Sequence, residues 1–462
     1  MSAIQELLIE GFVKKTISKC LVCETRCPAE VISQKSQDGK ELIVMRRTCP
    51  QHGTTDVVIG DAKFYWHAEG PVNKEGCGCG PGKACCVSPE GKDGTLGKNA
   101  TAPDEILSLP EQLSTCLALI EIVDSCNLKC PTCFAASPHG IGVNTKFHSF
   151  DFLTGNIDSV IGRKHKIEIL QFSGGEPTIH PEFFRLVQWV IAHPHIEVLL
   201  INTNGVRLAS DPEFMKEFGK IMMLENAAQK IQLYLQYDGP QLAGQKELRG
   251  ADLRAMRTKA IRGCEEIGLP ITLAMTVTRL NLDHLWEATE FAIPFENIRG
   301  ISFQPEFLAG RNPGKEDASH VPINVADVIN GLVTQSHGKI MTDDFTTLPC
   351  GDPNCAIIGW GFRMMGRIFS PKKFGVEISK IQASLRDRIH YNLEDLKQCG
   401  CENSRLGDIM KRLENPIARA FRFFIKPFMD KYSWDDHRLA RCCTHVITPD
   451  RRLVSFCEYY SS

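Results

Sequence analysis

Three closely spaced cysteines constrain this chain more than any other feature. Cys126, Cys130 and Cys133 form a C-x3-C-x2-C triplet directly after an apolar run at residues 117–123. A [4Fe–4S] cluster usually takes four cysteine thiolates, so three thiolates at this spacing can bind three irons and leave the fourth iron open. The apolar run predicts a buried strand that delivers the cysteines to a loop at its C-terminal end. The alternatives are a zinc knuckle and buried free cysteines.

A second apolar run ends in Gly174, Gly175, Glu176 and Pro177. Paired glycines allow close backbone approach, and a carboxylate suits a cationic amine. An open iron can chelate the amino and carboxylate groups of S-adenosylmethionine (SAM), and an electron from the cluster can then break a carbon–sulfur bond and release a radical. The triplet paired with Gly-Gly-Glu-Pro resembles the radical SAM superfamily. This resemblance implies that residues 174–177 contact the methionine amino group of SAM.

Residues 117–310 alternate apolar runs with helical patterns. The runs predict strands at 117–124, 167–172, 197–201, 231–236, 270–277 and 300–304, and one helical pattern covers 181–192. Six such units predict an α/β fold with parallel strands, and the resemblance implies a partial (β/α)6 barrel of the TIM type. Because such barrels gather function at the C-terminal ends of strands, SAM or substrate contacts are predicted there. The candidates are Asn202, Asn204, Gln236, Asp238, Thr276 and Gln304, with ordinary turn residues as the alternative.

Residues 1–68 predict a small metal-binding module. Cys20 and Cys23 form a C-x2-C pair, and Cys49 is followed by His52 after a β-like stretch at 41–45. Two ligand pairs on two turns, joined by a hairpin, can build a tetrahedral site for zinc or for a rubredoxin-like iron. The fourth ligand is His52 or Cys27, and a metal-free hairpin is the alternative.

Two further regions are rich in cysteine. Residues 69–115 predict a glycine-rich segment and flexible insertion in which an auxiliary cluster or a thiophilic metal is bound by Cys77, Cys79, Cys85 and Cys86, with Cys116 contributing. A disordered linker is the alternative. Residues 311–462 predict a C-terminal auxiliary region, with a second [4Fe–4S] cluster on Cys350, Cys355, Cys443 and Cys457. Buried free cysteines are the alternative there.

An aromatic and basic segment at residues 415–425 predicts a helix that starts at an Asn-Pro cap. Such a helix could line an apolar tunnel or touch a membrane surface. Packing in a hydrophobic core is the alternative.

Composition narrows the class of protein. The chain has 462 residues, with 53 Lys and Arg against 55 Asp and Glu, and this balance does not favour a nucleic-acid partner. No run of eighteen apolar residues and no signal-peptide core appears, so neither a transmembrane span nor secretion is expected. In a long, unsecreted chain, 20 cysteines favour metal and cluster binding in a reducing cytoplasm.

The motifs together resemble a subgroup of the superfamily. The segment around the triplet, the upstream C-x2-C and Cys-Pro-x-His-Gly elements, and the Cys-Cys-x-His near residue 445 are similar to tetraether lipid synthase and to radical SAM methylases acting on 7,8-dihydropterin. Thr132 stands where the superfamily usually has an aromatic residue. Residues 77–115 differ from the compact Cys-Pro-x-x-Cys-Gly-x-Cys element of the subgroup.

The resemblance implies a radical SAM transferase that forms a carbon–carbon or carbon–heteroatom bond on a lipid-like or pterin-like substrate. It would carry one SAM-binding [4Fe–4S] cluster and one or two auxiliary clusters, and draw electrons from a ferredoxin-like or flavodoxin-like donor. One alternative is radical transfer of a 3-amino-3-carboxypropyl or other alkyl group from SAM to arsenite, as in arsinothricin-type chemistry, since clustered thiolates bind soft centres. Another is a non-catalytic iron–sulfur electron carrier, which would have no reason to bind SAM.

Overall fold

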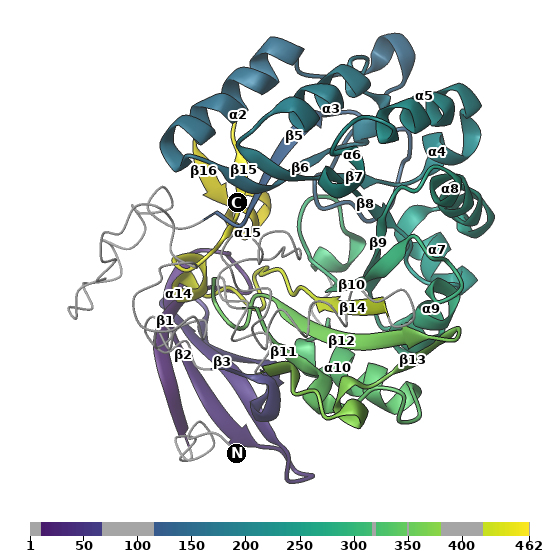
Figure 1. Ribbon diagram of the computed structural model, residues 1–462. Coiled ribbons are helices and arrows are strands. Elements are labelled where there is room, and N and C mark those ends of the chain that lie inside the picture. Colours follow the sequence, from purple (N-terminus) through teal and green to yellow (C-terminus); the bar gives the residue numbers. More distant parts are fainter. Residues whose placement is uncertain (1–10, 67–114, 317–319, 349–350, 380–418, 462) are drawn as a thin grey trace, which may run out of the picture.

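The computed structural model describes residues 11–66, 115–316, 320–348, 351–379 and 419–461. It contains a small four-stranded sheet near the N-terminus and one large curved sheet with helices around it (Figure 1). The sequence-based division at residues 68, 115 and 310 remains a prediction. The glycine- and cysteine-rich segment with Cys77, Cys79, Cys85 and Cys86 lies outside the described residues, as does Cys350.

The small sheet is a meander of consecutive antiparallel strands, which we call the ribbon. Its strands are β1 (Gly11–Lys19), β2 (Arg26–Lys35), β3 (Glu41–Cys49) and β4 (Gly53–Asp61). Alternate residues pack inward, and Val31, Ile43 and Met45 form a small core. Because each strand reverses the direction of the one before, the β1–β2 and β3–β4 turns meet at the same end of the sheet. That end carries the predicted metal ligands.

Six parallel strands in chain order form the centre of the large sheet. They are β5 (Leu117–Val123), β6 (Ile167–Gly174), β7 (Ile196–Thr203), β8 (Ile231–Gln236), β9 (Ile271–Val277) and β10 (Ile298–Pro305). Each of the six predicted strands is confirmed to within a few residues, and so is the partial barrel. Strands β5, β7 and β9 are mostly apolar, as expected of parallel strands buried on both faces, whereas β8 alternates and lines the barrel interior with Gln232 and Tyr234.

Helices connect these strands and cover the outer side of the curved sheet (Figure 1). They are α2 (Phe150–Lys164), α3 (Phe183–Ala192), α4 (Val206–Ser210), α5 (Pro212–Met222), α6 (Ala227–Lys230), α7 (Leu242–Arg249), α8 (Arg254–Glu266), α9 (Leu285–Ala292) and α10 (Val325–Gln335). The apolar faces of the helices and strands share one large core. No helix in the described ranges is both long and apolar enough to cross a membrane.

The C-terminal region extends the barrel at both edges. β14 (Arg419–Ile425) pairs in parallel with β10, and β15 (Thr444–Ile447) pairs in parallel with β5. The remaining elements are β11 (Phe345–Thr347), β12 (Ile357–Met364), β13 (Arg367–Phe369), α14 (Asp436–Leu439), β16 (Leu453–Ser455) and α15 (Phe456–Ser461). Both free edges of the six-stranded core are therefore covered by residues that come late in the chain.

The prediction of a helix over residues 415–425 is wrong where the structure describes it, because residues 419–425 form strand β14. Phe421, Phe423 and Ile425 are fully buried, whereas Arg422 and Phe424 line a chamber inside the barrel. This alternation is the period of a strand, and aromatic residues favour strands that pack on both faces. The Asn-Pro dipeptide that suggested a helix cap lies outside the described residues.

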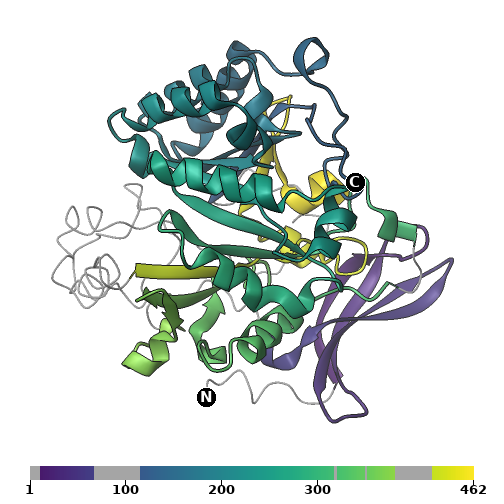
Figure 2. The ribbon, with the colours of Figure 1, turned by 90° about the vertical axis from the view of Figure 1, so that its right-hand side faces the viewer.

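The ribbon packs against the C-terminal region (Figure 2). Lys14 forms an ion pair of 2.6 Å with Asp435, and the Thr16 hydroxyl donates to the same carboxylate at 2.7 Å. The buried Arg47 donates to the Tyr432 carbonyl at 2.7 Å. Partnered charges buried at this junction would be costly to separate, so the ribbon supports the segment that carries the last cysteines.

Candidate active site and metal centre

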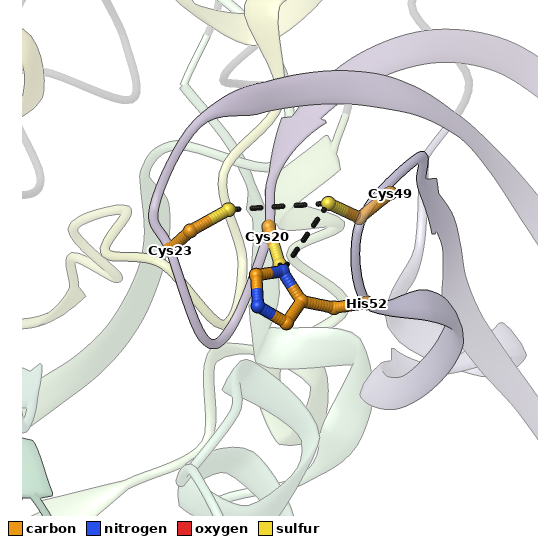
Figure 3. A group of neighbouring side chains, drawn as sticks. All are labelled: Cys20, Cys23, Cys49 and His52. Atoms are coloured by element: carbon orange, nitrogen blue, oxygen red, sulfur yellow. Dashed lines mark hydrogen bonds between the residues drawn. The ribbon is translucent and has the colours of Figure 1, made fainter.

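The ribbon gathers four metal-binding side chains at one end. Cys20 and Cys23 lie at the β1–β2 turn, and Cys49 and His52 lie at the β3–β4 turn (Figure 3). The Cys23 and Cys49 sulfurs are 3.9 Å apart, and His52 Nδ1 lies 3.6 Å from the Cys20 sulfur and 3.5 Å from the Cys49 sulfur. Zinc bonds of about 2.3 Å to sulfur and about 2.0–2.1 Å to nitrogen place tetrahedral ligands about 3.8 Å and 3.5 Å apart. The group therefore fits one zinc ion.

Cys27 lies next to this group without joining it. Its side chain is buried on β2 beside Cys20 and Cys49, while His52 supplies the fourth atom of the set. Hydrogen bonds from Thr25 lower the pKa of the Cys23 thiol to about 6, so this ligand is ionised at neutral pH. Of the two fourth ligands left open by the sequence, the geometry favours His52.

The cysteine triplet lies on a loop after β5 that is bonded to the end of β6. The backbone N–H of Gly175 donates to the Val123 carbonyl at 2.8 Å, and that of Glu176 donates to the Ser125 carbonyl at 3.1 Å. A Cβ atom on Gly175 would lie 2.0 Å from the Ser125 oxygen. The paired glycines thus do allow close backbone approach, and the segment they approach is the loop that carries Cys126.

Replacing Gly175 with alanine is expected to displace the cysteine loop. The added Cβ meets a backbone oxygen that cannot rotate away, and overpacking of this kind costs about 1–3 kcal/mol. Thermal unfolding measures the loss of stability, and iron content after reconstitution measures whether the displaced cysteine loop still binds a cluster. Gly155→Ala is the matched control, because nothing lies within 4 Å of the added atom on α2 and alanine favours a helix. Equal iron content in both variants would contradict the expectation.

The other side of the loop is held by Arg311, which the sequence analysis missed. Its backbone exchanges hydrogen bonds with Cys133 at 2.7 and 2.9 Å, and its Nε donates to the Cys130 carbonyl at 2.9 Å. Arg311 follows β10, so its position after the sixth predicted strand was the available signal. The loop is therefore fixed from both β6 and β10.

A cavity of about 170 Å³ lies at the C-terminal ends of the barrel strands, and we call it the triplet cavity. Nearly all candidates from the sequence line it: Cys126, Cys130, Cys133, Gly174, Gly175, Glu176, Asn202, Asn204, Gln236, Thr276 and Gln304. Pro177 instead starts the short η4 helix (Pro177–Ile179) and is buried. Asp238 is fully buried beneath the cavity wall.

Glu176 ties the ends of β6 and β7 together. Its Oε1 accepts hydrogen bonds from the Thr178 hydroxyl at 2.6 Å and the Thr203 hydroxyl at 2.7 Å, and its Oε2 accepts from the Asn204 backbone N–H at 2.7 Å. Burial raises the pKa of the carboxyl, and these donors oppose the shift. A carboxylate oxygen accepts about two hydrogen bonds, so Oε2 keeps room for one further donor.

Asp238 acts on the cavity through Arg249, a second residue that the sequence analysis missed. Arg249 Nε and one terminal nitrogen donate to the Asp238 carboxylate at 2.7 and 2.9 Å, and that nitrogen also donates to the Thr276 hydroxyl at 3.0 Å. Burial opposes ionisation of Asp238, but Arg249 outweighs it and lowers the carboxyl pKa. Arg249 also lies beside Cys130 and opposes the rise in that thiol's pKa caused by burial.

Replacing Asp238 with asparagine is expected to destabilise the fold by about 3–5 kcal/mol, because Arg249 and Arg257 would keep buried charges without their counter-ion. Denaturant unfolding measures this loss. Asp252→Asn is the control, since the Asp252–Arg254 pair is about two-fifths exposed and such pairs contribute about 0–1 kcal/mol. A similar loss in both variants would contradict a special role for the buried pair.

The triplet fits a cluster better than a single ion. Among the described residues, the four ribbon side chains are the group gathered within 4.8 Å, so the triplet sulfurs lie too far apart to share one ion. Burial, followed by the nearby Glu176 charge, raises the pKa of the Cys126 thiol to about 12. Ionisation at neutral pH therefore requires bound metal. The buried Asn202 Oδ1 in the cavity wall has no partner among the described residues and can accept a hydrogen bond from a ligand.

The described C-terminal cysteines form a second set of thiols. Burial raises the pKa of Cys355, Cys442 and Cys457 to about 12, and these three thiols act electrostatically on one another. Cys443 follows Cys442, and its carbonyl accepts from the backbone N–H of Cys116 at 3.0 Å. The structure therefore brings Cys116, Cys355, Cys443 and Cys457 to one region. It adds Cys442, which the sequence analysis did not select.

A second chamber of about 140 Å³ lies deeper inside the barrel, and we call it the lumen chamber. Its floor is formed by side chains from the middle and N-terminal parts of the strands, and by β14. It shares wall residues with the triplet cavity, namely Gln171, Tyr234, Gln304, Phe428 and Phe456. Thr444, which directly follows the Cys442–Cys443 pair, also lines it. The lumen chamber thus shares wall residues with the triplet cavity and is lined by a residue next to the C-terminal thiols.

Comparisons with known proteins agree with this geometry. Residues 120–292 match the radical SAM superfamily, which is the span from β5 to α9. Over these residues the chain therefore has a radical SAM domain, and the chain is an enzyme. Residues 12–61 match the HMPTM N-terminal zinc ribbon domain, which is the span of the ribbon.

Several curated relatives share parts or most of the chain. It is 26% identical to 7,8-dihydro-6-hydroxymethylpterin dimethyltransferase of Methanocaldococcus jannaschii, over 96% of this chain and 93% of that protein. It is 26% identical to mycofactocin maturase MftC of Mycolicibacterium smegmatis, over 48% of this chain and 53% of that protein. Among solved structures, Streptococcus suis SuiB is 16% identical with a TM-score of 0.35, over 44% of this chain and 43% of that one.

Proposed function

We propose that this enzyme cleaves SAM reductively at a [4Fe–4S] cluster on Cys126, Cys130 and Cys133, and transfers a methyl or other alkyl group to a carbon of a pterin-like substrate. The observation that carries the proposal is the shared wall of the triplet cavity and the lumen chamber. A substrate in the chamber would meet SAM in the cavity without leaving the barrel. The likeness to a pterin dimethyltransferase over nearly the whole chain supports this substrate class.

The residues of the triplet cavity have separable roles in this proposal. When bound, the cluster supplies the electron that breaks a carbon–sulfur bond of SAM. Glu176 Oε2 has room to accept a hydrogen bond from the methionine amine, and Asn202 Oδ1 has room for another donor of SAM. Phe134 packs against Phe456 at 5.5 Å and against Tyr460 at 4.8 Å, so α15 closes one side of the cavity against water.

The lumen chamber has mainly apolar walls, and a few amide and hydroxyl groups in them could orient a planar polar heterocycle. Gln232 donates to the Thr272 hydroxyl at 2.5 Å, and Gln304 donates to the Tyr234 hydroxyl at 2.9 Å. Within the described part of the chain, the Gln171 amide has no hydrogen-bond partner, although it faces the space shared by both cavities. A hydrocarbon chain would leave the Gln171 amide unpaired at a cost of about 1–3 kcal/mol. The amide-like edge of a pterin can pair with it.

We further propose that the C-terminal thiols bind an auxiliary cluster. Cys355, Cys442 and Cys457 are buried thiols that bound metal would ionise. Cys443 lies beside Gly351, the residue after Cys350, since a Cβ atom on that glycine would lie 3.2 Å from the Cys443 sulfur. An external ferredoxin-like or flavodoxin-like protein would supply the electrons.

The test is an anaerobic assay of the reconstituted enzyme. It is reduced with dithionite in the presence of methyl-labelled SAM and 7,8-dihydro-6-hydroxymethylpterin, and SAM fragments and pterin products are identified by mass spectrometry. 5′-Deoxyadenosine together with an alkylated pterin is expected, and the label shows whether SAM is the alkyl donor. Methylthioadenosine would overturn the proposal in favour of aminocarboxypropyl transfer. Intact SAM with intact clusters would favour an electron carrier.

A further inference from the structure

Arg422 is a cation inside the barrel for which the described residues supply no counter-ion. It lies on β14 between two strands, with backbone partners Gly300 on β10 and Trp360 on β12. Its side chain lines the lumen chamber. Among the described residues, no carboxylate pairs with it and no side-chain hydrogen bond satisfies its guanidinium. Charges withdrawn from bulk water in native proteins are normally paired, and the half-buried Arg422 guanidinium is therefore suited to bind an anionic partner.

The surroundings of Arg422 add positive charge and an aromatic surface. Burial, followed by repulsion from Arg299, lowers the pKa of Arg422 to about 10, so it stays charged at neutral pH. Its guanidinium carbon lies 5.8 Å from the ring centre of Phe424, the next lumen-facing residue along β14. Lys426 comes after Phe424 on the same face, and its ammonium donates to the Thr444 hydroxyl at 3.1 Å. Arg422 and Phe424 on β14, and Lys426 directly after the strand, therefore place a cation, an aromatic ring and a second cation in the chamber wall.

We propose that Arg422 binds an oxyanion of the substrate, so that the enzyme acts on an anionic, phosphorylated or carboxylated heterocycle. The inference deepens the proposed function and rests on it for the identity of the ring. A guanidinium matches a phosphate or carboxylate with two parallel hydrogen bonds, and Phe424 offers a face on which a planar ring can stack. Bound in this way, the substrate would extend from β14 toward Gln171 and the triplet cavity.

The test is equilibrium binding to the anaerobically reconstituted holoenzyme with SAM present and no reductant, so that no turnover is needed. The probes are a neutral 6-hydroxymethyl dihydropterin, its phosphate ester and the matched 6-carboxylate. We expect one of the two anionic probes to bind at least about tenfold more tightly than the neutral probe, which is about 1.4 kcal/mol. Arg422→Gln should remove this preference and leave the affinity for the neutral probe within about twofold. If only the phosphate ester binds more tightly than the neutral probe, the group that Arg422 recognises is a phosphate. If the ester and the carboxylate both bind more tightly, Arg422 recognises either oxyanion.

Two results would overturn the inference: equal binding of all three probes to the unmodified enzyme, or a preference that survives Arg422→Gln. Arg422→Lys keeps the charge and should retain part of the preference, which guards against misfolding of the glutamine variant. Arg46→Gln is the control, because this arginine is exposed on the ribbon, pairs with Asp56 and does not line the lumen chamber. Alkylation of the neutral pterin without an anion preference would reject the inference alone. Arg422-dependent binding without alkylation of any probe would reject the proposed reaction alone.

Discussion

Replacing Cys126 with alanine is expected to abolish reductive cleavage of SAM. The variant keeps two thiols of the triplet, too few to hold three irons of a cluster. We expect the rate of SAM cleavage to fall by roughly 10³-fold or more, which corresponds to about 4 kcal/mol of activation free energy. Mass spectrometry of the SAM fragments and iron content measure the loss. Iron at the C-terminal thiols and zinc in the ribbon should remain.

Cys264→Ala is the matched control for this variant. Cys264 is a fully buried cysteine on α8 within the main hydrophobic core, far in sequence from every proposed ligand. Its replacement should cost some stability through lost packing, and leave iron content and SAM cleavage near those of the unmodified enzyme. If the Cys126 and Cys264 variants cleaved SAM equally well, the triplet would not be the site of cleavage.

Replacing Cys49 with alanine is expected to release zinc and loosen the C-terminal region as well as the ribbon. Structural zinc contributes about 10–16 kcal/mol in isolated zinc-finger peptides, so a loss of several kcal/mol is expected here. Cys49 ends β3, the strand whose Arg47 donates to the Tyr432 carbonyl. Zinc content, thermal unfolding and hydrogen exchange over residues 429–461 measure the three effects.

Cys27→Ala separates loss of zinc from loss of a buried sulfur. Cys27 lies in the same buried cluster as Cys20 and Cys49 and is not one of the four gathered ligands. The Cys27 variant should keep its zinc and the protection of residues 429–461. If the Cys27 variant lost zinc and the Cys49 variant kept it, Cys27 and not Cys49 would be the zinc ligand.

The barrel was predictable because its signals are local. Each central strand is a short apolar run, and parallel strands buried on both faces require such runs. The segment at 419–425 was misread because aromatic and basic residues occur in both helices and strands. Buried and chamber-facing side chains alternate along this segment, and the alternation identifies a strand only once β10 and β12 are known to lie on either side of it.

The candidate site likewise contains residues that the sequence could predict and residues that it could not. Motif residues such as Gly174 and Glu176 were found because their spacing is fixed by the loop they bond to. Arg249, Arg311 and Arg422 were missed because single arginines carry no spacing signal. Arg249 and Arg311 acquire their roles from partners more than ten residues away, Asp238 for Arg249 and Cys130 for Arg311. Long-range pairing of this kind is not encoded in local sequence patterns.

The pairing of β14 and β15 with opposite edges of the barrel has a consequence for how the protein is made. A ribosome that has released β10 must still add the residues up to β15, which at typical elongation rates takes roughly 7–28 s. The edge of β10 stays unpaired until β14 is made and that of β5 until β15 is made, and such edges pair readily with other chains. The nascent chain is therefore most prone to aggregate during this interval. Added chaperone that shields the exposed strand edges until β14 and β15 are made should raise the yield of intact enzyme. Growth at a lower temperature should have the same effect.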